Sequence, residues 1–215
     1  MDIDALVKSF NEEDKERFVS IALNAIENNE IDIPFLYEEV LKMLLYSIDE
    51  CTTDDCIWRE HRKTSMVRTV IECMYPYVIK IKNETKSLNK KVLLICPEKE
   101  YHEIGLRMID DFLQMNGYET VFIGTNTPKG QVLAAVLSMK PDYLAISVTD
   151  YYLLFEAQKI TNLIKEKTCN VKIIVGGNAF KGNYESIKSI GGDIYLETYQ
   201  DIKNLREGDE NEIIL

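Results

Sequence analysis

At 215 residues, with 46% hydrophobic and 28% charged residues, the chain is long enough for one large domain or two small ones, each with its own core. Its formal net charge of −11 excludes a surface that follows nucleic-acid phosphates, because such a surface must be basic. Residues 1–4 do not resemble a signal peptide, and no apolar run approaches the roughly 20 residues of a membrane span. We therefore expect a cytoplasmic protein that contacts neither membranes nor nucleic acid directly.

The first eighty residues have the hydrophobic periodicity of helices. Residues 12–28 place apolar side chains at helical spacing, and Pro34 opens a second helical segment, where proline costs no hydrogen bond. Thr53 is the candidate N-cap of a third segment, which we expect Pro76 to end or kink. The apolar stripe of this third segment consists of Met66, Val67, Val70, Ile71 and Met74. Residues 1–82 are thus predicted to form an acidic helical cap domain of three or four helices.

The pattern changes after residues 83–90, which we interpret as a linker. Residues 92–96 are a continuous apolar run, typical of a strand buried on both faces. The further strand candidates are 120–123, 143–147, 171–175 and 194–196, and the helical segments between them are 103–116, 128–139, 151–167 and 183–190. Such alternation predicts a parallel sheet with right-handed crossovers. Residues 91–215 are therefore expected to form a flavodoxin-like (Rossmann-like) α/β domain with five strands in the order 2-1-3-4-5.

The loop after the first predicted strand is the first place to look for a ligand. In an open parallel sheet, ligands bind beyond the carboxyl ends of the strands, where the strand order reverses. This loop contains His102, one of two histidines in the chain, with Glu100 two residues before it. A lone histidine at a strand end is equally an ordinary exposed loop residue. No phosphate-binding Gly-x-Gly-x-x-Gly is present, and Ser147 stands where a phosphorylation receiver would carry its aspartate, which argues against both of those functions.

Three short motifs together resemble the signature of cobalamin-binding domains. They are Glu100-x-His102-x-x-Gly105, Ser147-Val148-Thr149 and Gly176-Gly177, in the order and spacing of Asp/Glu-x-His-x-x-Gly, Ser-x-Leu or Ser-x-Thr, and Gly-Gly. The resemblance implies a corrinoid cofactor, namely adenosyl-, methyl- or hydroxocobalamin. It also implies that His102 binds the cobalt in place of the cofactor's own base, while the Glu100 carboxylate accepts the other ring N–H and fixes the tautomer.

The remaining motif residues acquire roles from the same resemblance. Gly105 and the Gly176-Gly177 pair would allow the nucleotide tail of the cofactor to approach the backbone, and Ser147 and Thr149 would offer it hydroxyl groups. From the residues alone, the glycine pair is equally an ordinary turn between a strand and a helix.

At some positions the residues differ from those of the related cobalamin-binding proteins. The His102 loop lacks the flanking residues of methyltransferase corrinoid proteins and is closer to that of cobalamin-dependent photoreceptor regulators. Glu60-His61 reproduces a pair that covers the upper face of the cofactor in those photoreceptors, although it is equally a solvated helix face. Their tryptophan is replaced by Glu50, and Trp58, the only tryptophan, lies two residues before the pair. Leu153 stands where some family members carry the serine of a His–carboxylate–Ser relay.

Three functions are compatible with these features. The photoreceptor-like loop and the Glu60-His61 pair favour a stand-alone cobalamin or light sensor that acts through a protein partner. The alternatives are a corrinoid methyl carrier of a multi-component methyltransferase system and a corrinoid storage or delivery protein. In each, cobalt carries the chemistry, so we do not expect the chain to be an enzyme by itself. The partner would be a regulator or a methyltransferase, and the sequence also allows a homodimer.

Overall fold

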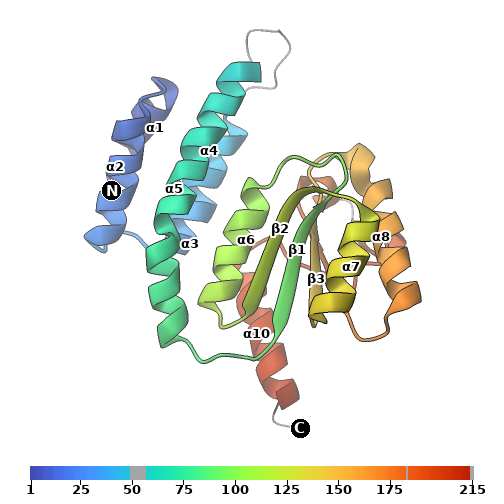
Figure 1. Ribbon diagram of the computed structural model, residues 1–215. Helices are drawn as coiled ribbons and strands as arrows, with labels where there is room; N and C mark the ends of the chain where they lie inside the picture. Colours follow the sequence, from blue (N-terminus) through green and yellow to red (C-terminus); the bar gives the residue numbers. More distant parts are fainter. Residues whose placement is uncertain (49–56, 183, 214–215) are drawn as a thin grey trace. The chain divides into compact units, whose positions relative to one another are not determined.

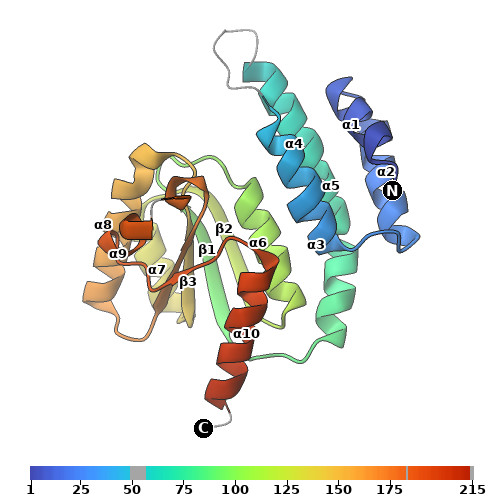
Figure 2. The ribbon, with the colours of Figure 1, turned by 180° about the vertical axis from the view of Figure 1, so that it is seen from behind.

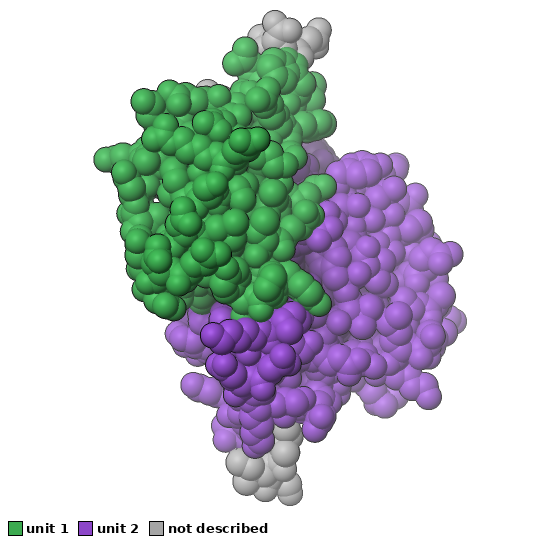
Figure 3. All heavy atoms as spheres, turned by 60° about the vertical axis from the view of Figure 1, so that its left-hand side comes forward, with its two compact units in different colours: residues 1–78 green, residues 79–215 purple. Residues whose placement is uncertain are grey.

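The computed structural model describes residues 1–48, 57–182 and 184–213 (Figure 1). The chain divides into two compact units, Met1–Val78 and Ile79–Leu215 (Figure 3). The division falls within one long helix, α5, which runs from Ile57 to Glu84. Within the described residues, no helix is long and apolar enough to cross a membrane.

The first unit is helical, as the sequence predicts. Its helices are α1 (Ile3–Asn11), α2 (Lys15–Glu27), α3 (Ile33–Phe35), the π-helical turn η1 (Leu36–Leu41), α4 (Lys42–Tyr46) and the first part of α5. The side chains of Asp2, Asp14 and Asp32 cap α1, α2 and α3, each accepting a hydrogen bond from a backbone N–H in the first turn. Helix α1 was not predicted from the sequence, and Thr53 lies outside the described residues.

The long helix α5 differs from the prediction at its C-terminal end. The predicted apolar stripe is buried, but the helix does not end at Pro76. Pro76 lies on the exposed side of the helix, while Met74 and Val78 are buried on the other side. Continued packing on that buried side therefore outweighs the backbone hydrogen bond that a proline removes. The helix reaches Glu84, so the predicted linker begins inside it.

The second unit contains the predicted parallel sheet. Its strands are β1 (Lys91–Pro97), β2 (Glu119–Thr127), β3 (Tyr143–Ser147), β4 (Lys172–Gly176) and β5 (Ile194–Tyr195). The strands lie in the order β2-β1-β3-β4-β5, and all four pairs are parallel. Strands β1 and β3 are fully buried apart from Lys91, which is why their sequences are continuously apolar. The predicted fold class and strand order are confirmed.

Helices cover both faces of this sheet (Figures 1 and 2). They are α6 (Ile104–Met115), α7 (Lys129–Met139), α8 (Leu154–Lys167), α9 (Tyr184–Ser189) and α10 (Tyr199–Ile213), with the single turns η2 (Tyr151–Leu153) and η3 (Asn178–Phe180). Helices α6 and α10 lie on one face, and α7 and α8 lie on the other. The chain therefore leaves β1 and β3, which are neighbours, toward opposite faces. This is the switch point at which a ligand site is expected.

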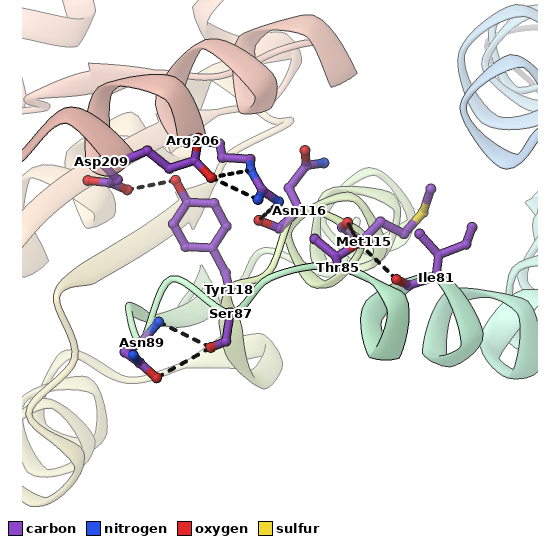
Figure 4. Close-up of polar contacts among 10 residues, drawn as sticks. Ile81, Thr85, Ser87, Asn89, Met115, Asn116, Tyr118, Arg206 and Asp209 are labelled. Atoms are coloured by element: carbon purple, nitrogen blue, oxygen red, sulfur yellow. Dashed lines mark hydrogen bonds and ion pairs between the residues drawn. The ribbon is translucent and has the colours of Figure 1, made fainter. Parts of the chain in front are cut away.

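The C-terminal helix α10 was not predicted, and polar contacts hold it near the amino ends of the strands (Figure 4). The buried Asp209 carboxylate accepts hydrogen bonds from the hydroxyls of Tyr118 at 2.6 Å and Tyr143 at 2.5 Å. Arg206 donates to the carbonyl oxygen of Asn116 at 2.9 Å. These contacts occupy one end of the sheet and leave the carboxyl end for the candidate site.

The segment that follows α5 is also tied to this end of the second unit. The Thr85 hydroxyl donates to the carbonyl oxygen of Met115 at 3.1 Å (Figure 4). The amide of Leu88 donates to the carbonyl oxygen of Gly117 at 3.0 Å. The Leu88 side chain is buried. The predicted linker is therefore tied to the α/β unit through Thr85 and Leu88, although most of its residues are exposed.

Candidate functional site

The loop between β1 and α6 presents His102 at the carboxyl end of the sheet. It begins with a tight turn in which Lys99 adopts a left-handed backbone conformation, with φ of 72°, and Glu100 N–H donates to the carbonyl oxygen of Pro97 at 3.0 Å. This turn directs Glu100 inward, where it is fully buried, and leaves the His102 side chain 60% exposed. Helix α6 then begins at Ile104.

The Glu100 carboxylate joins this loop to the loop that follows β3. Its Oε1 accepts hydrogen bonds from His102 Nδ1 at 2.6 Å and from the His102 backbone N–H at 2.9 Å. Its Oε2 accepts from the backbone N–H groups of Thr149 at 2.8 Å and Asp150 at 3.0 Å. Burial by itself would raise the pKa of this carboxyl, but the hydrogen bonds from the His102 ring and from the three backbone amides lower it to about 2. Glu100 is therefore an anion at neutral pH.

The charge of Glu100 determines which nitrogen of His102 carries the proton. An ionised carboxylate only accepts hydrogen bonds, so Nδ1, at 2.6 Å from Oε1, must be the protonated nitrogen. In a neutral imidazole the lone pair then lies on Nε2, the far side of the exposed ring. The contact between Glu100 and His102 that the resemblance implies is present, and it places the Nε2 lone pair on the exposed side of the ring.

The three predicted site glycines differ in whether the surrounding structure has room for a side chain. At Gly177, where φ is 102°, an added Cβ would lie 2.3 Å from the carbonyl oxygen of Val148, and at Gly176 it would lie 2.6 Å from that of Leu196. The glycine pair is thus required by the close approach of the chain's own backbone. At Gly105, in the exposed first turn of α6, an added Cβ would meet nothing within 4 Å. Among the three, only Gly105 has open space in the direction of an added Cβ.

The Ser-x-Thr motif ends β3 directly beside this loop. Ser147 is the last residue of the strand, is buried, and pairs with Gly176 of β4. Thr149 contributes its backbone N–H to Glu100, and its side chain is partly exposed. Both residues therefore lie at the carboxyl end of the sheet, as predicted.

Several exposed aromatic side chains lie on the same two loops and on the start of the following helix. They are Tyr101, Tyr151, Tyr152 and Phe155, each more than half exposed. The rings of Tyr151 and Tyr152 contact each other edge to face, and the ammonium group of Lys159 lies 4.4 Å from the centre of the Phe155 ring. Exposed aromatic groups beside a candidate ligand atom are typical of a surface that a large apolar group covers.

Sequence reasoning missed two contributors to this site. The backbone N–H of Asp150 completes the set of donors to Glu100, and the Cys96 thiol donates to the carbonyl oxygen of His102 with a sulfur–oxygen distance of 3.7 Å. Burial, followed by the nearby charges of Glu100 and Glu103, raises the pKa of Cys96 to about 12, so this thiol stays protonated. Cys96 could have been noticed as the polar residue next to the end of β1. The role of Asp150 depends on backbone geometry and leaves no signal in the sequence.

Leu153 stands where some family members carry the relay serine, and here backbone amides take the place of a serine hydroxyl as donors to Glu100. Leu153 ends the turn η2 and carries no polar side-chain atom. The second oxygen of Glu100 is instead satisfied by the amides of Thr149 and Asp150. The His–carboxylate pair is therefore complete without a hydroxyl partner.

The predicted upper-face residues lie in the other compact unit, at the start of α5. Trp58 is half exposed, with the guanidinium of Arg59 5.0 Å from its ring centre, and His61 is exposed. Trp58 and His61 share a helix face because they are three residues apart, whereas Glu60 does not lie between them on that face. Glu50 lies outside the described residues. A role for these residues in covering a cofactor stays a prediction.

Comparison with known proteins places the second unit in an established family. A family model described as the B12 binding domain matches residues 90–201. The HTH-type transcriptional repressor CarA of Myxococcus xanthus is 22% identical over 144 residues, 67% of this chain and 48% of that protein. Trimethylamine corrinoid protein 1 of Methanosarcina acetivorans is 28% identical over 138 residues, 63% of this chain and 62% of that protein. The matched regions thus span only about half to three fifths of these relatives.

Solved structures match over both units. The monomethylamine corrinoid protein of Methanosarcina barkeri has a TM-score of 0.81 and 16% sequence identity, covering 94% of this chain and 95% of that one. The methanol:cobalamin methyltransferase complex of the same organism contains a chain that matches with a TM-score of 0.52 and 20% identity, covering 96% of this chain and 78% of that one. These similarities support the fold described above.

Proposed function

Because this chain belongs to the B12 binding domain family, and its cofactor is accordingly a cobalamin, we propose that it is a corrinoid methyl carrier that serves separate methyltransferases. The observation that carries the proposal is the pair formed by Glu100 and His102 at the switch point, with a 2.6 Å hydrogen bond and an exposed ring. A bound corrinoid would supply a cobalt centre that accepts a methyl group from one partner and gives it to another.

The residues present fit this cofactor. The lone pair on His102 Nε2 is a suitable cobalt donor, and the Glu100 anion raises its donor strength through the protonated Nδ1. The open space beside Gly105 leaves room at the start of α6, and the exposed aromatic side chains offer apolar area for a macrocycle. The Gly176-Gly177 pair contributes indirectly, since it lets the loops after β3 and β4 approach each other.

Two observations favour the carrier over the sensor, which reverses the preference drawn from the sequence. The relatives include trimethylamine and methanol corrinoid proteins, whose names join a corrinoid to a methylated compound. The photoreceptor motif is incomplete, because Glu50 replaces its tryptophan and Trp58 stands at a different point of α5. The partner is accordingly proposed to be a methyltransferase. The regulator partner and the homodimer gain no support from the comparisons.

In this proposal the chain's own residues bind and orient the cofactor. His102 would hold the cobalt, Glu100 keeps the imidazole in one tautomer and one orientation, and the amides of Thr149 and Asp150 help to keep Glu100 ionised. A ligand fixed in this way costs less conformational entropy when it binds the metal.

The ligand assignment can be tested by electron paramagnetic resonance. Protein grown with ¹⁵N-histidine is loaded with hydroxocobalamin and reduced to the Co(II) form. We expect each cobalt hyperfine line to split into a doublet from ¹⁵N, where unlabelled protein gives the ¹⁴N triplet. His102→Ala should abolish the doublet, while His61→Ala, a change at the only other histidine, should retain it. A triplet in labelled wild-type protein would show that the cofactor keeps its own base and would refute the assignment.

The carrier role needs a separate assay. The loaded protein, reduced to the Co(I) state so that cobalt supplies the electron pair of the new Co–C bond, is mixed with methanol- or methylamine-specific corrinoid methyltransferases and a ¹⁴C-methyl substrate, and bound label is measured after gel filtration. We expect label on the wild-type protein and a large loss with His102→Ala. The sensor would instead be supported if no methyltransferase labelled the protein and if illumination changed the molecular mass of the adenosylcobalamin-loaded protein.

A further inference from the structure

The end of β2 has an irregular backbone directly beside the His102 loop. Its register with β1 shifts twice, between Leu94 and Ile95 and again between Ile95 and Pro97, so β2 carries extra residues at its carboxyl end. Asn126 lies in the second irregular stretch and has a left-handed backbone conformation, with φ of 51°. Such bulges redirect side chains, and asparagine tolerates this conformation better than most residues.

Asn126 holds the loop through two hydrogen bonds. Its side-chain Oδ1 accepts from the backbone N–H of Lys99 at 2.8 Å, and its own backbone N–H donates to the carbonyl oxygen of Glu100 at 2.9 Å. Lys99 is the left-handed residue of the tight turn that directs Glu100 inward. Asn126 therefore fixes the turn whose geometry determines where Glu100, and through it His102, is held.

We infer that Asn126 is a positioning residue for the cobalt ligand, a role that rests on the proposed binding of cobalt by His102. The loop after β1 is then held from both neighbouring strands. On the β3 side, the Glu100 carboxylate binds the amides of Thr149 and Asp150. On the β2 side, Asn126 binds the backbone of Lys99 and Glu100. The hydrogen bond to Glu100 orients the exposed imidazole, and that orientation is better defined when the loop that carries both residues is fixed on both sides.

Three substitutions separate the contributions of Asn126. Asn126→Gly keeps the left-handed conformation accessible and removes only the side-chain acceptor. Asn126→Asp retains an acceptor oxygen and should rescue the effect. Asn89→Gly is the matched control, because Asn89 is another exposed asparagine of the second unit with φ of 54°, in the segment that precedes β1.

The first measurement uses cofactor-free protein. Hydrogen exchange of the Lys99 amide, followed by NMR, should be faster in Asn126→Gly than in the wild type by about fivefold, the loss expected for one exposed hydrogen bond. The rate should be close to the wild-type rate in Asn126→Asp and in Asn89→Gly. An unchanged Lys99 rate in Asn126→Gly would overturn the inference.

The second measurement uses ¹⁵N-histidine-labelled protein loaded with hydroxocobalamin and reduced. We expect Asn126→Gly to lower the fraction of the signal that shows the ¹⁵N doublet, with recovery in Asn126→Asp and no change in Asn89→Gly. If wild-type protein shows no doublet, the proposed cobalt ligation fails. If the wild type shows it and Asn126→Gly shows it equally, the ligation stands and the positioning role fails.

Discussion

The Glu100 side chain and the Thr149 backbone, 49 residues apart in the chain, are joined by a 2.8 Å hydrogen bond at the carboxyl end of the sheet. The same carboxylate binds the Nδ1 atom of His102 at 2.6 Å. One buried anion thus connects the two loops at the switch point and orients the only exposed histidine of the second unit. All four donors to this carboxylate belong to the chain itself, so the arrangement needs no group from outside it.

Removal of this carboxylate should destabilise the cofactor-free protein. Glu100→Ala leaves the backbone amides of Thr149 and Asp150 without their acceptor, so we expect the free energy of unfolding to fall by about 2 to 3 kcal/mol. Urea denaturation followed by circular dichroism measures the change. Glu98→Ala, at an exposed position of the same loop, is the control and should change stability by less than about 0.5 kcal/mol. Equal effects of the two substitutions would contradict a structural role for Glu100.

Local signals in the sequence were sufficient to predict much of this arrangement. The apolar runs of the buried strands and the helical periodicity between them indicated a parallel sheet, and the sheet order placed the β1 loop at a switch point. The contact between Glu100 and His102 was implied by the resemblance of the loop to that of cobalamin-binding domains. The sheet and its helices depend on neighbours in the chain, and periodicity records such neighbours.

The features that could not be predicted depend on residues far apart in the sequence. The amide of Asp150 reaches Glu100 across 50 positions, and nothing in a backbone N–H marks that partner. Helix α10 has few apolar residues, with Ile202 fully buried, and is held by Asp209 and two tyrosines from other elements. A polar helix held by long-range hydrogen bonds has no hydrophobic periodicity strong enough to predict it.

The motif glycines should respond differently to the same substitution. Gly177→Ala forces a Cβ to within 2.3 Å of the Val148 carbonyl oxygen at a positive φ, so we expect a loss of about 3 kcal/mol or more in the free energy of unfolding. Gly105→Ala meets open space within a helix and should raise stability by up to about 1 kcal/mol. Urea denaturation of cofactor-free protein tests both values.

For Gly105→Ala, we expect the effect on the affinity for hydroxocobalamin to be opposite to the effect on stability. If the cofactor approaches the start of α6, the added methyl group of Gly105→Ala should weaken binding even though the protein itself is more stable. Titration followed by absorbance measures the dissociation constant. An affinity equal to that of the wild type would show that Gly105 does not contact the cofactor.

Asp110 on α6 should make stability depend on pH. Its Oδ1 is buried without a hydrogen-bond partner among the described residues, and burial raises the pKa of this carboxyl above its ordinary 3.8 despite hydrogen bonds from Thr120 and Gln114. A raised pKa in the folded state favours folding below pH 3.8, and that contribution is lost as the pH rises through the folded value. Asp110→Asn, which cannot ionise, should therefore gain about 1 kcal/mol at pH 7 and less at pH 4.

Urea denaturation between pH 4 and pH 7 tests whether the stability gained by Asp110→Asn grows as the pH rises. Glu98→Gln is the matched control because it removes one negative charge from an exposed position. The informative quantity is the difference between the two variants at each pH. A gain for Asp110→Asn that is the same at pH 4 and pH 7 would show that the buried carboxyl is not the cause.

Asp209 should support the C-terminal helix without affecting the proposed cofactor site. Its carboxylate accepts hydrogen bonds from the hydroxyls of Tyr118 and Tyr143. Burial, followed by the hydrogen bond to Asp209, raises the pKa of Tyr118, so this phenol stays a protonated donor (Figure 4). Asp209→Ala leaves two buried hydroxyls without an acceptor, and we expect a loss of about 3 kcal/mol in the free energy of unfolding. Glu207→Ala, at an exposed position of α10, should change stability by less than about 0.5 kcal/mol.

The position of Asp209 allows a second test on the same variant. Tyr143 begins β3 at one end of the sheet, and Ser147 ends the strand beside the His102 loop at the other. Asp209→Ala should therefore speed hydrogen exchange in α10 but leave the ¹⁵N doublet of the cobalamin-loaded protein unchanged under conditions where the variant is folded. Loss of the doublet would mean that the two ends of the sheet are coupled, because a local defect at the amino ends would then alter ligation at the carboxyl ends.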